Sequence, residues 1–119
     1  MLAMNAHVSA FLIEQIYYSL DNNLLLNALF LATRLRAHEP DSTEASYLVS
    51  LCHLRLNQPG LAAEYSERFA SEGLDLGCGF VFAQSCLGLG RFLEGIDALE
   101  RNRQSWSRRT NHRLQMLPY

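Results

Sequence analysis

An internal repeat constrains the fold of this 119-residue chain more than any other feature. When the sequence is shifted by 33 residues, Tyr47 falls on Phe80, and a shift of 34 places Ala28 on Ala62. Large residues thus match large ones and small residues match small ones. A period of this length is typical of helical units that bury their apolar faces only by stacking on their neighbours. The sequence therefore predicts a short solenoid of similar units.

Each unit is predicted to be a pair of antiparallel helices. Apolar residues recur at the spacing of one helix face, strand signals are nearly absent, and Asn, Pro and Gly separate the segments. The expected helices cover residues 8–20, 24–38, 44–56, 59–71, 77–89 and 91–103, which pair into hairpins 8–38, 44–71 and 77–103. The predicted fold class is all-α: stacked hairpins resembling a tetratricopeptide solenoid, with about six helices and a basic tail.

Small residues stand where the paired helices should approach each other most closely. Ser50 precedes Ala62 by 12 residues, and Ala83 precedes Gly95 by the same number. The predicted packing positions are Ala28, Ser50, Ala62, Ala83 and Gly95. The glycines of "GLGRFLEGIDALE" fit this scheme, because Gly90 allows a left-handed turn and the lysine of a phosphate-binding loop is missing. The first hairpin, with "SLDNN" between its helices, is expected to have a roomier loop.

Catalysis, cofactors and metals find no support in the sequence. The four histidines are scattered, and the three cysteines lack the paired short spacing of zinc sites. They read as reduced, buried thiols of a cytosolic or nuclear protein. A net charge of −2 gives no reason to expect binding to nucleic acid or a membrane, and nothing indicates a small-molecule ligand.

The segment from residue 104 to 119 carries Arg108, Arg109 and Arg113 but no acidic residue. We interpret it as a basic linker or tail that follows a domain of residues 1–103. Two other uses stay open: contact with a nucleic-acid backbone, and folding back of Trp106 and Leu114 over the last helix.

The first hairpin is apolar on too many sides for a helix pair that stands at the end of a solenoid. Because two-fold dimers dominate soluble oligomers, we expect this surplus to be covered by a second copy of the chain. The predicted dimer interface consists of Phe11, Leu12, Ile16, Tyr17, Leu25, Leu29 and Phe30.

A second hypothesis uses the concave surface formed by the first helix of each hairpin. Solenoids of this type bind extended peptides on that surface. The residues expected to line such a groove are Tyr47, His53, Gln84 and Leu87.

Two stretches, "NALFLATRLRAHEPDSTEASYLVSLCHLRL" and "GFVFAQSCLGLGRFLEGIDALE", resemble the N-terminal tetratricopeptide domain of the anaphase-promoting complex subunit 3 (cell division control protein 27) family, and its fungal members most closely. The resemblance covers about residues 8–106. It implies a much longer subunit of a ubiquitin ligase that times anaphase, located in the nucleus and cytoplasm. It also implies that this domain makes a homodimer contact and adjoins other subunits of the complex, whereas coactivators bind later repeats.

Overall fold

The computed structural model describes the backbone of residues 6–71 and 76–116 and the side chains of residues 6–71 and 77–104. Within these residues the chain forms six helices and no strand. They are α1 (Ala6–Asp21), α2 (Leu25–His38), α3 (Thr43–Arg55), α4 (Pro59–Ser71), α5 (Leu76–Gly88) and α6 (Phe92–Met116). The predicted all-α fold class is confirmed, and every predicted helix end except that of α6 lies within two residues of the observed one.

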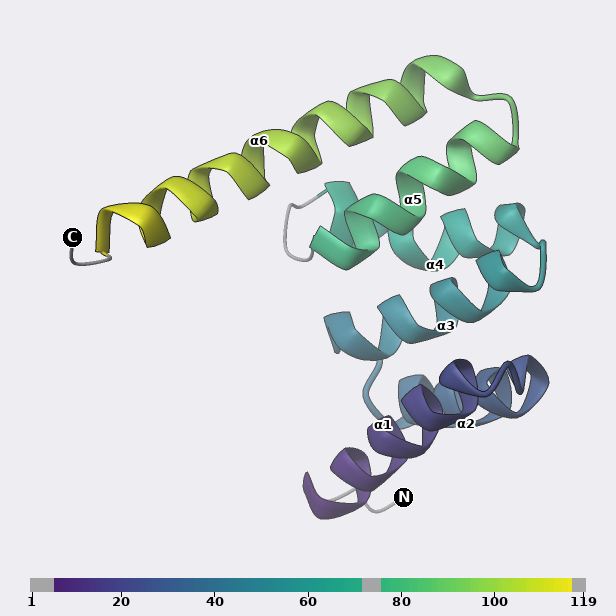
Figure 1. Cartoon of the computed structure of the whole chain (residues 1–119). Helices are drawn as coiled ribbons and strands as arrows, with labels where there is room; N and C mark the ends of the chain where they lie inside the picture. The colour runs from purple at the N-terminus through teal and green to yellow at the C-terminus, as the bar shows by residue number, and fades with distance from the viewer. Residues whose placement is uncertain (1–5, 72–75, 117–119) are drawn as a thin grey trace.

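The helices pair into three hairpins, α1–α2, α3–α4 and α5–α6, that are stacked on one another (Figure 1). Each helix packs on the next one in the chain, and α3 packs on α5 as well. The first hairpin forms one end of the stack and α6 forms the other. This order is the stacked-hairpin arrangement that the repeat predicts.

The three hairpins share one turn geometry. Three residues separate the paired helices in each hairpin, and the middle residue has a positive φ angle: Asn23 (60°), Asn57 (61°) and Gly90 (80°). In each turn the amide that follows this residue bonds to a carbonyl oxygen five positions earlier: Leu24 to Ser19 (2.7 Å), Gln58 to His53 (2.8 Å) and Arg91 to Cys86 (2.8 Å). This pattern is the Schellman motif. The expectation of a roomier first loop is therefore wrong, because asparagine adopts the left-handed conformation there as glycine does in the third turn.

All five predicted packing positions lie in the interior. Ala28, Ser50, Ala62 and Ala83 are fully buried, and Gly95 is buried as well. Their neighbours form two apolar clusters, one built on the first two hairpins and one on the last two. The paired helices therefore meet at positions where little side-chain volume separates their backbones.

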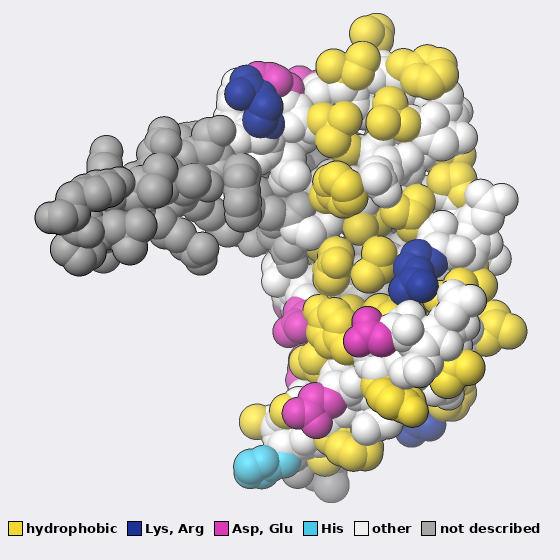
Figure 2. Space-filling model, in the orientation of Figure 1, with side chains coloured by type: hydrophobic (Ala, Val, Ile, Leu, Met, Phe, Trp, Pro, Cys, Tyr) yellow, Lys and Arg dark blue, Asp and Glu magenta, His cyan; other side chains and the backbone are white. Residues whose placement is uncertain are grey.

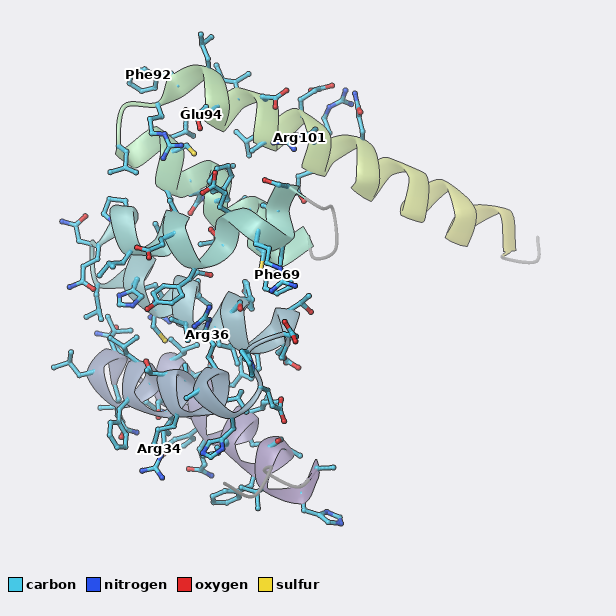
Figure 3. All side chains as sticks on the ribbon, turned by 180° about the vertical axis from the view of Figure 1, so that it is seen from behind. Arg34, Arg36, Phe69, Phe92, Glu94 and Arg101 are labelled. Carbon is cyan, nitrogen blue, oxygen red and sulfur yellow. The ribbon has the colours of Figure 1, made fainter. Side chains whose placement is uncertain are left out.

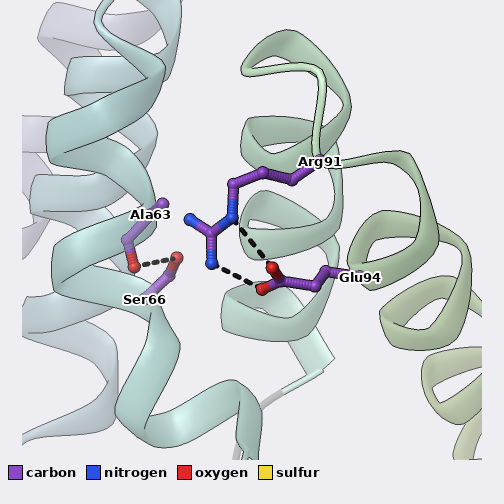
Figure 4. A network of polar contacts seen from close by, with 4 residues as sticks. All are labelled: Ala63, Ser66, Arg91 and Glu94. Carbon is purple, nitrogen blue, oxygen red and sulfur yellow. Dashed lines mark hydrogen bonds and ion pairs between the residues drawn. The ribbon is translucent and has the colours of Figure 1, made fainter.

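Several buried serines in the stack satisfy their own hydroxyl groups. The Ser66 hydroxyl donates to the carbonyl oxygen of Ala62 at 2.7 Å and lies 3.4 Å from that of Ala63, the contact drawn in Figure 4. The Ser85 hydroxyl donates to the carbonyl oxygen of Val81 at 2.7 Å. A hydroxyl that bonds one turn back along its own helix needs no partner across the interface. Ser66 and Ser85 can therefore serve as small packing residues without leaving an unpaired hydroxyl group, whereas the buried Ser46 hydroxyl has no partner among the described residues.

The predicted end of the sixth helix near Arg103 is wrong, because α6 continues to Met116 and extends beyond the other helices (Figure 1). No Gly or Pro occurs between Gln104 and Met116, and a run of basic residues does not by itself end a helix. The side chains from residue 105 onward, including those of Trp106 and Arg108, lie outside the described part. The division into residues 1–103 and a tail of 104–119 stays a prediction.

Candidate interaction surface

Apolar side chains are exposed at the end of the stack that the first hairpin forms. On α1, Phe11 and Tyr18 are 60% and 61% exposed, and on α2, Leu26 and Phe30 are 73% and 59% exposed. Residues three, four or seven apart share one side of a helix, so each helix presents a row that also contains a charge. We define the N-terminal end face by these two rows: Phe11, Glu14 and Tyr18 on α1, and Leu26, Phe30 and Arg34 on α2. The Arg34 side chain points away from the other hairpins (Figure 3).

The seven residues predicted for the dimer interface have different environments. Phe11 and Phe30 lie on the N-terminal end face, while Tyr17 is 38% exposed on the side of α1 that reaches α3, with its hydroxyl 3.5 Å from Glu44 Oε1. Three of the predicted residues are half-buried against the core: Leu12, Leu25 and Leu29. Ile16 is fully buried between the helices of its own chain, so the prediction that it belongs to a contact surface is wrong.

Sequence reasoning left Val8, Tyr18, Leu24 and Leu26 out of this surface, although all four are at least 42% exposed. The sequence feature that indicates their exposure is that apolar residues occur on most sides of the first two helices. An apolar residue on such a helix can face either the core or the solvent, and periodicity does not separate the two cases.

A second exposed apolar surface lies at the other end of the stack, on α6. Phe92, Leu93 and Ile96 are 61%, 86% and 58% exposed, and we call these three residues the C-terminal end face. Figure 2 shows apolar side chains gathered at this end of the molecule. A comparison of equivalent positions in the repeat could have predicted this surface. A shift of 33 places Ala63 on Ile96, and Ala63, which belongs to the core between α4 and α5, is only 4% exposed. In the described structure no helix covers α6 in the way that α5 covers α4.

Not all of the four residues predicted to line a groove are available to contact a peptide. Tyr47 is half-buried, and Gln84 and Leu87 are exposed on α5. The His53 ring, in contrast, stacks on Tyr65 of α4, with ring centroids 5.5 Å apart, and its Nδ1 lies 2.8 Å from Gln58 Oε1. His53 is thus engaged in the packing of α3 on α4.

Exposed charges near the start of α6 pair within the chain. The Arg91 guanidinium donates two hydrogen bonds to the Glu94 carboxylate (Figure 4), and these bonds lower the pKa of Glu94. Asp97 pairs with Arg101 one turn further along. The side chains of Glu14 and Arg34 differ from these, because neither forms an ion pair or a hydrogen bond with any residue that the structure describes.

The described residues offer little reactive chemistry. They contain no group of three His, Cys, Asp or Glu side chains that could hold a metal ion. All three thiols are buried, and burial raises the pKa of Cys52 to about 11, which leaves it protonated at neutral pH. None of the described helices combines the length and the apolar character that crossing a membrane requires.

Comparison with known proteins identifies related sequences. The family described as "Anaphase-promoting complex, cyclosome, subunit 3" matches residues 21–102. Protein bimA of Emericella nidulans is 52% identical over 112 residues, which are 94% of this chain and 14% of the relative. Anaphase-promoting complex subunit 3 of Schizosaccharomyces pombe is 34% identical over 91 residues, which are 76% of this chain and 13% of the relative. The chain thus spans about one seventh of the length of these relatives.

Proposed function

Because the chain belongs to the family of anaphase-promoting complex subunit 3, we propose that it is a non-catalytic assembly domain through which a subunit of that complex pairs with a second copy of itself. The observation that carries this proposal is the N-terminal end face. A solenoid end that stands alone normally presents polar side chains, whereas this one exposes three aromatic rings and a leucine at about 60% or more. Other subunits of the complex would bind elsewhere on the domain.

The type of exposed side chain supports the same proposal. Phe11, Tyr18 and Phe30 are exposed aromatic residues, and aromatic side chains are enriched at the centre of protein interfaces.

The mass of the purified chain in solution tests the proposal. Light scattering at micromolar concentration should give twice the chain mass, and Phe30→Glu should reduce it to one chain without loss of helical circular dichroism. Leu93→Glu is the matched control, because Leu93 is an exposed leucine on α6 at the opposite end of the stack. It should leave the dimer intact. A wild-type chain that is monomeric and soluble at these concentrations would refute the proposal.

A second candidate function rests on a different observation. Phe80, Gln84 and Leu87 share one side of α5, and the two apolar residues are 48% and 36% exposed. This row could contact an extended apolar peptide on the concave surface. Titration of apolar peptides onto the domain should then broaden or shift the NMR signals of α5, and unchanged spectra at high micromolar peptide would exclude this function.

A further inference from the structure

The N-terminal end face carries one acidic and one basic residue on different helices. Glu14 lies between Phe11 and Tyr18 on α1, and Arg34 follows Phe30 by one turn on α2. Both charged residues are exposed. Neither makes an ion pair with the described residues of its own chain, although ion pairs are formed freely along α6.

The Arg34 side chain is oriented by a contact with the neighbouring Phe30 ring. Its guanidinium carbon lies 5.6 Å from the centroid of the Phe30 ring, a distance at which a cation is attracted to an aromatic face. None of the described residues accepts a hydrogen bond from this guanidinium. The charge is thus held beside the apolar centre of the face and can bind a carboxylate there.

We infer that in the dimer Glu14 of each protomer pairs with Arg34 of the partner subunit, so that α1 of one chain lies on α2 of the other. This inference rests on the proposed self-pairing. A two-fold interface must be complementary to itself, and any contact from one residue to another occurs twice. An acid on one helix and a base on the other meet this requirement when α1 crosses onto α2. A contact of α2 with α2 would instead offer Arg34 no acidic partner, because α2 contains neither aspartate nor glutamate.

The two ion pairs would set the register of the dimer more than its overall affinity. Phe11, Tyr18, Leu26 and Phe30 supply the apolar surface that is removed from water. Charges at the margin of such a surface mainly exclude wrong orientations and wrong partners, because a like-charge contact is costly in a partly dehydrated site. The proposed pairs therefore favour a second copy of this chain over an unrelated apolar surface.

Charge reversal tests the inference directly. Glu14→Arg places arginine at both positions of each proposed pair, and Arg34→Glu places glutamate at both, so each variant alone should form homodimers about tenfold or more weaker than wild type. A mixture of the two variants restores an acid opposite a base in both pairs. The mixed dimer should recover to within about threefold of wild type, and the double variant Glu14→Arg/Arg34→Glu should recover as a homodimer.

Sedimentation equilibrium of the separate and mixed variants gives these affinities, with one protomer labelled to detect the mixed dimer. Glu64→Arg on α4 is the control, because it changes the net charge by the same amount at an exposed site outside the end face. The inference is wrong if wild type dimerises and Phe30→Glu abolishes the dimer, but the two reversals do not rescue each other. A monomeric wild type would instead refute the proposed function itself.

Discussion

Gly95 packs directly on the backbone of Ala83: a Cβ atom at Gly95 would lie 3.2 Å from the Ala83 carbonyl oxygen and 2.9 Å from Leu87 Cδ2. Carbon atoms in ordinary van der Waals contact lie about 3.5 to 4.0 Å apart, so α5 and α6 meet at a separation that leaves no room for a larger residue. This contact is the physical reason for small residues at positions 83 and 95, which are 12 residues apart in the sequence.

We expect Gly95→Ala to lower the free energy of unfolding by about 1 to 3 kcal/mol, because the added methyl group must displace Leu87 and separate two helix backbones. Gly60→Ala is the control. Nothing lies within 4 Å of a Cβ atom at Gly60, so the substitution should be neutral or stabilise α4 by up to about 1 kcal/mol. Urea denaturation of both variants gives the comparison, and equal effects would contradict the close contact.

The shared turn geometry predicts which residues the middle position of each turn accepts. Gly90 has a φ of 80°, a conformation that costs other residues about 1 to 2 kcal/mol, so Gly90→Ala should destabilise the chain by that amount. Gly90→Asn should cost less than half as much, because Asn23 and Asn57 adopt the same conformation. Thermal unfolding measures both, and an alanine variant as stable as the asparagine variant would refute the argument.

The hairpins could be predicted because their signals are local. Pro59 begins α4, Gly90 lies in the third turn, and small residues recur with the repeat. Each of these residues acts within its own helix or turn, or across one helix pair. The family could likewise be identified from the sequence, since residues of all three hairpins carry it.

The composition of the end faces could not be predicted in the same way. Ile16 is fully buried and Phe11 is 60% exposed, yet both belong to a helix that is apolar on most sides. Which side of α1 faces the core depends on how α1 packs against α2 and α3, and the periodicity of the sequence does not determine this tertiary packing. The exposed Ile96 was missed because its counterpart Ala63 is covered by a following helix, and the sequence of α6 alone does not show whether such a helix is present.

Arg55 links the first two turns and should contribute measurably to stability. Its Nη1 donates to the Leu20 carbonyl oxygen at 3.1 Å, at the end of α1, and its Nη2 lies 3.4 Å from Asn23 Oδ1. Arg55→Ala should lower the free energy of unfolding by about 1 kcal/mol, because a charged donor then leaves the end of a helix. Arg101→Ala, which removes only an exposed pair with Asp97, should cost less than about 0.5 kcal/mol. The prediction fails if chemical denaturation ranks the two variants in the opposite order.

Burial of Cys52 predicts a loss of stability in alkaline solution. The pKa of this thiol is raised from 9.0 to about 11 in the folded chain, chiefly because burial disfavours the thiolate, although the nearby Arg55 charge opposes the shift. Between these pH values the folded chain holds a proton that the unfolded chain has released, so the free energy of unfolding falls as the pH rises from 9 to 11. The stabilisation is fully present below pH 9, and its loss amounts to at most about 2 to 3 kcal/mol.

Cys52→Ala removes the titrating group while the tyrosines and the other two thiols stay in place. Its free energy of unfolding, measured with urea at several pH values, should therefore decline less steeply above pH 9 than that of wild type. If the free energy of unfolding falls with pH equally in both chains, the thiol titrates alike in the folded and unfolded states and the prediction is wrong.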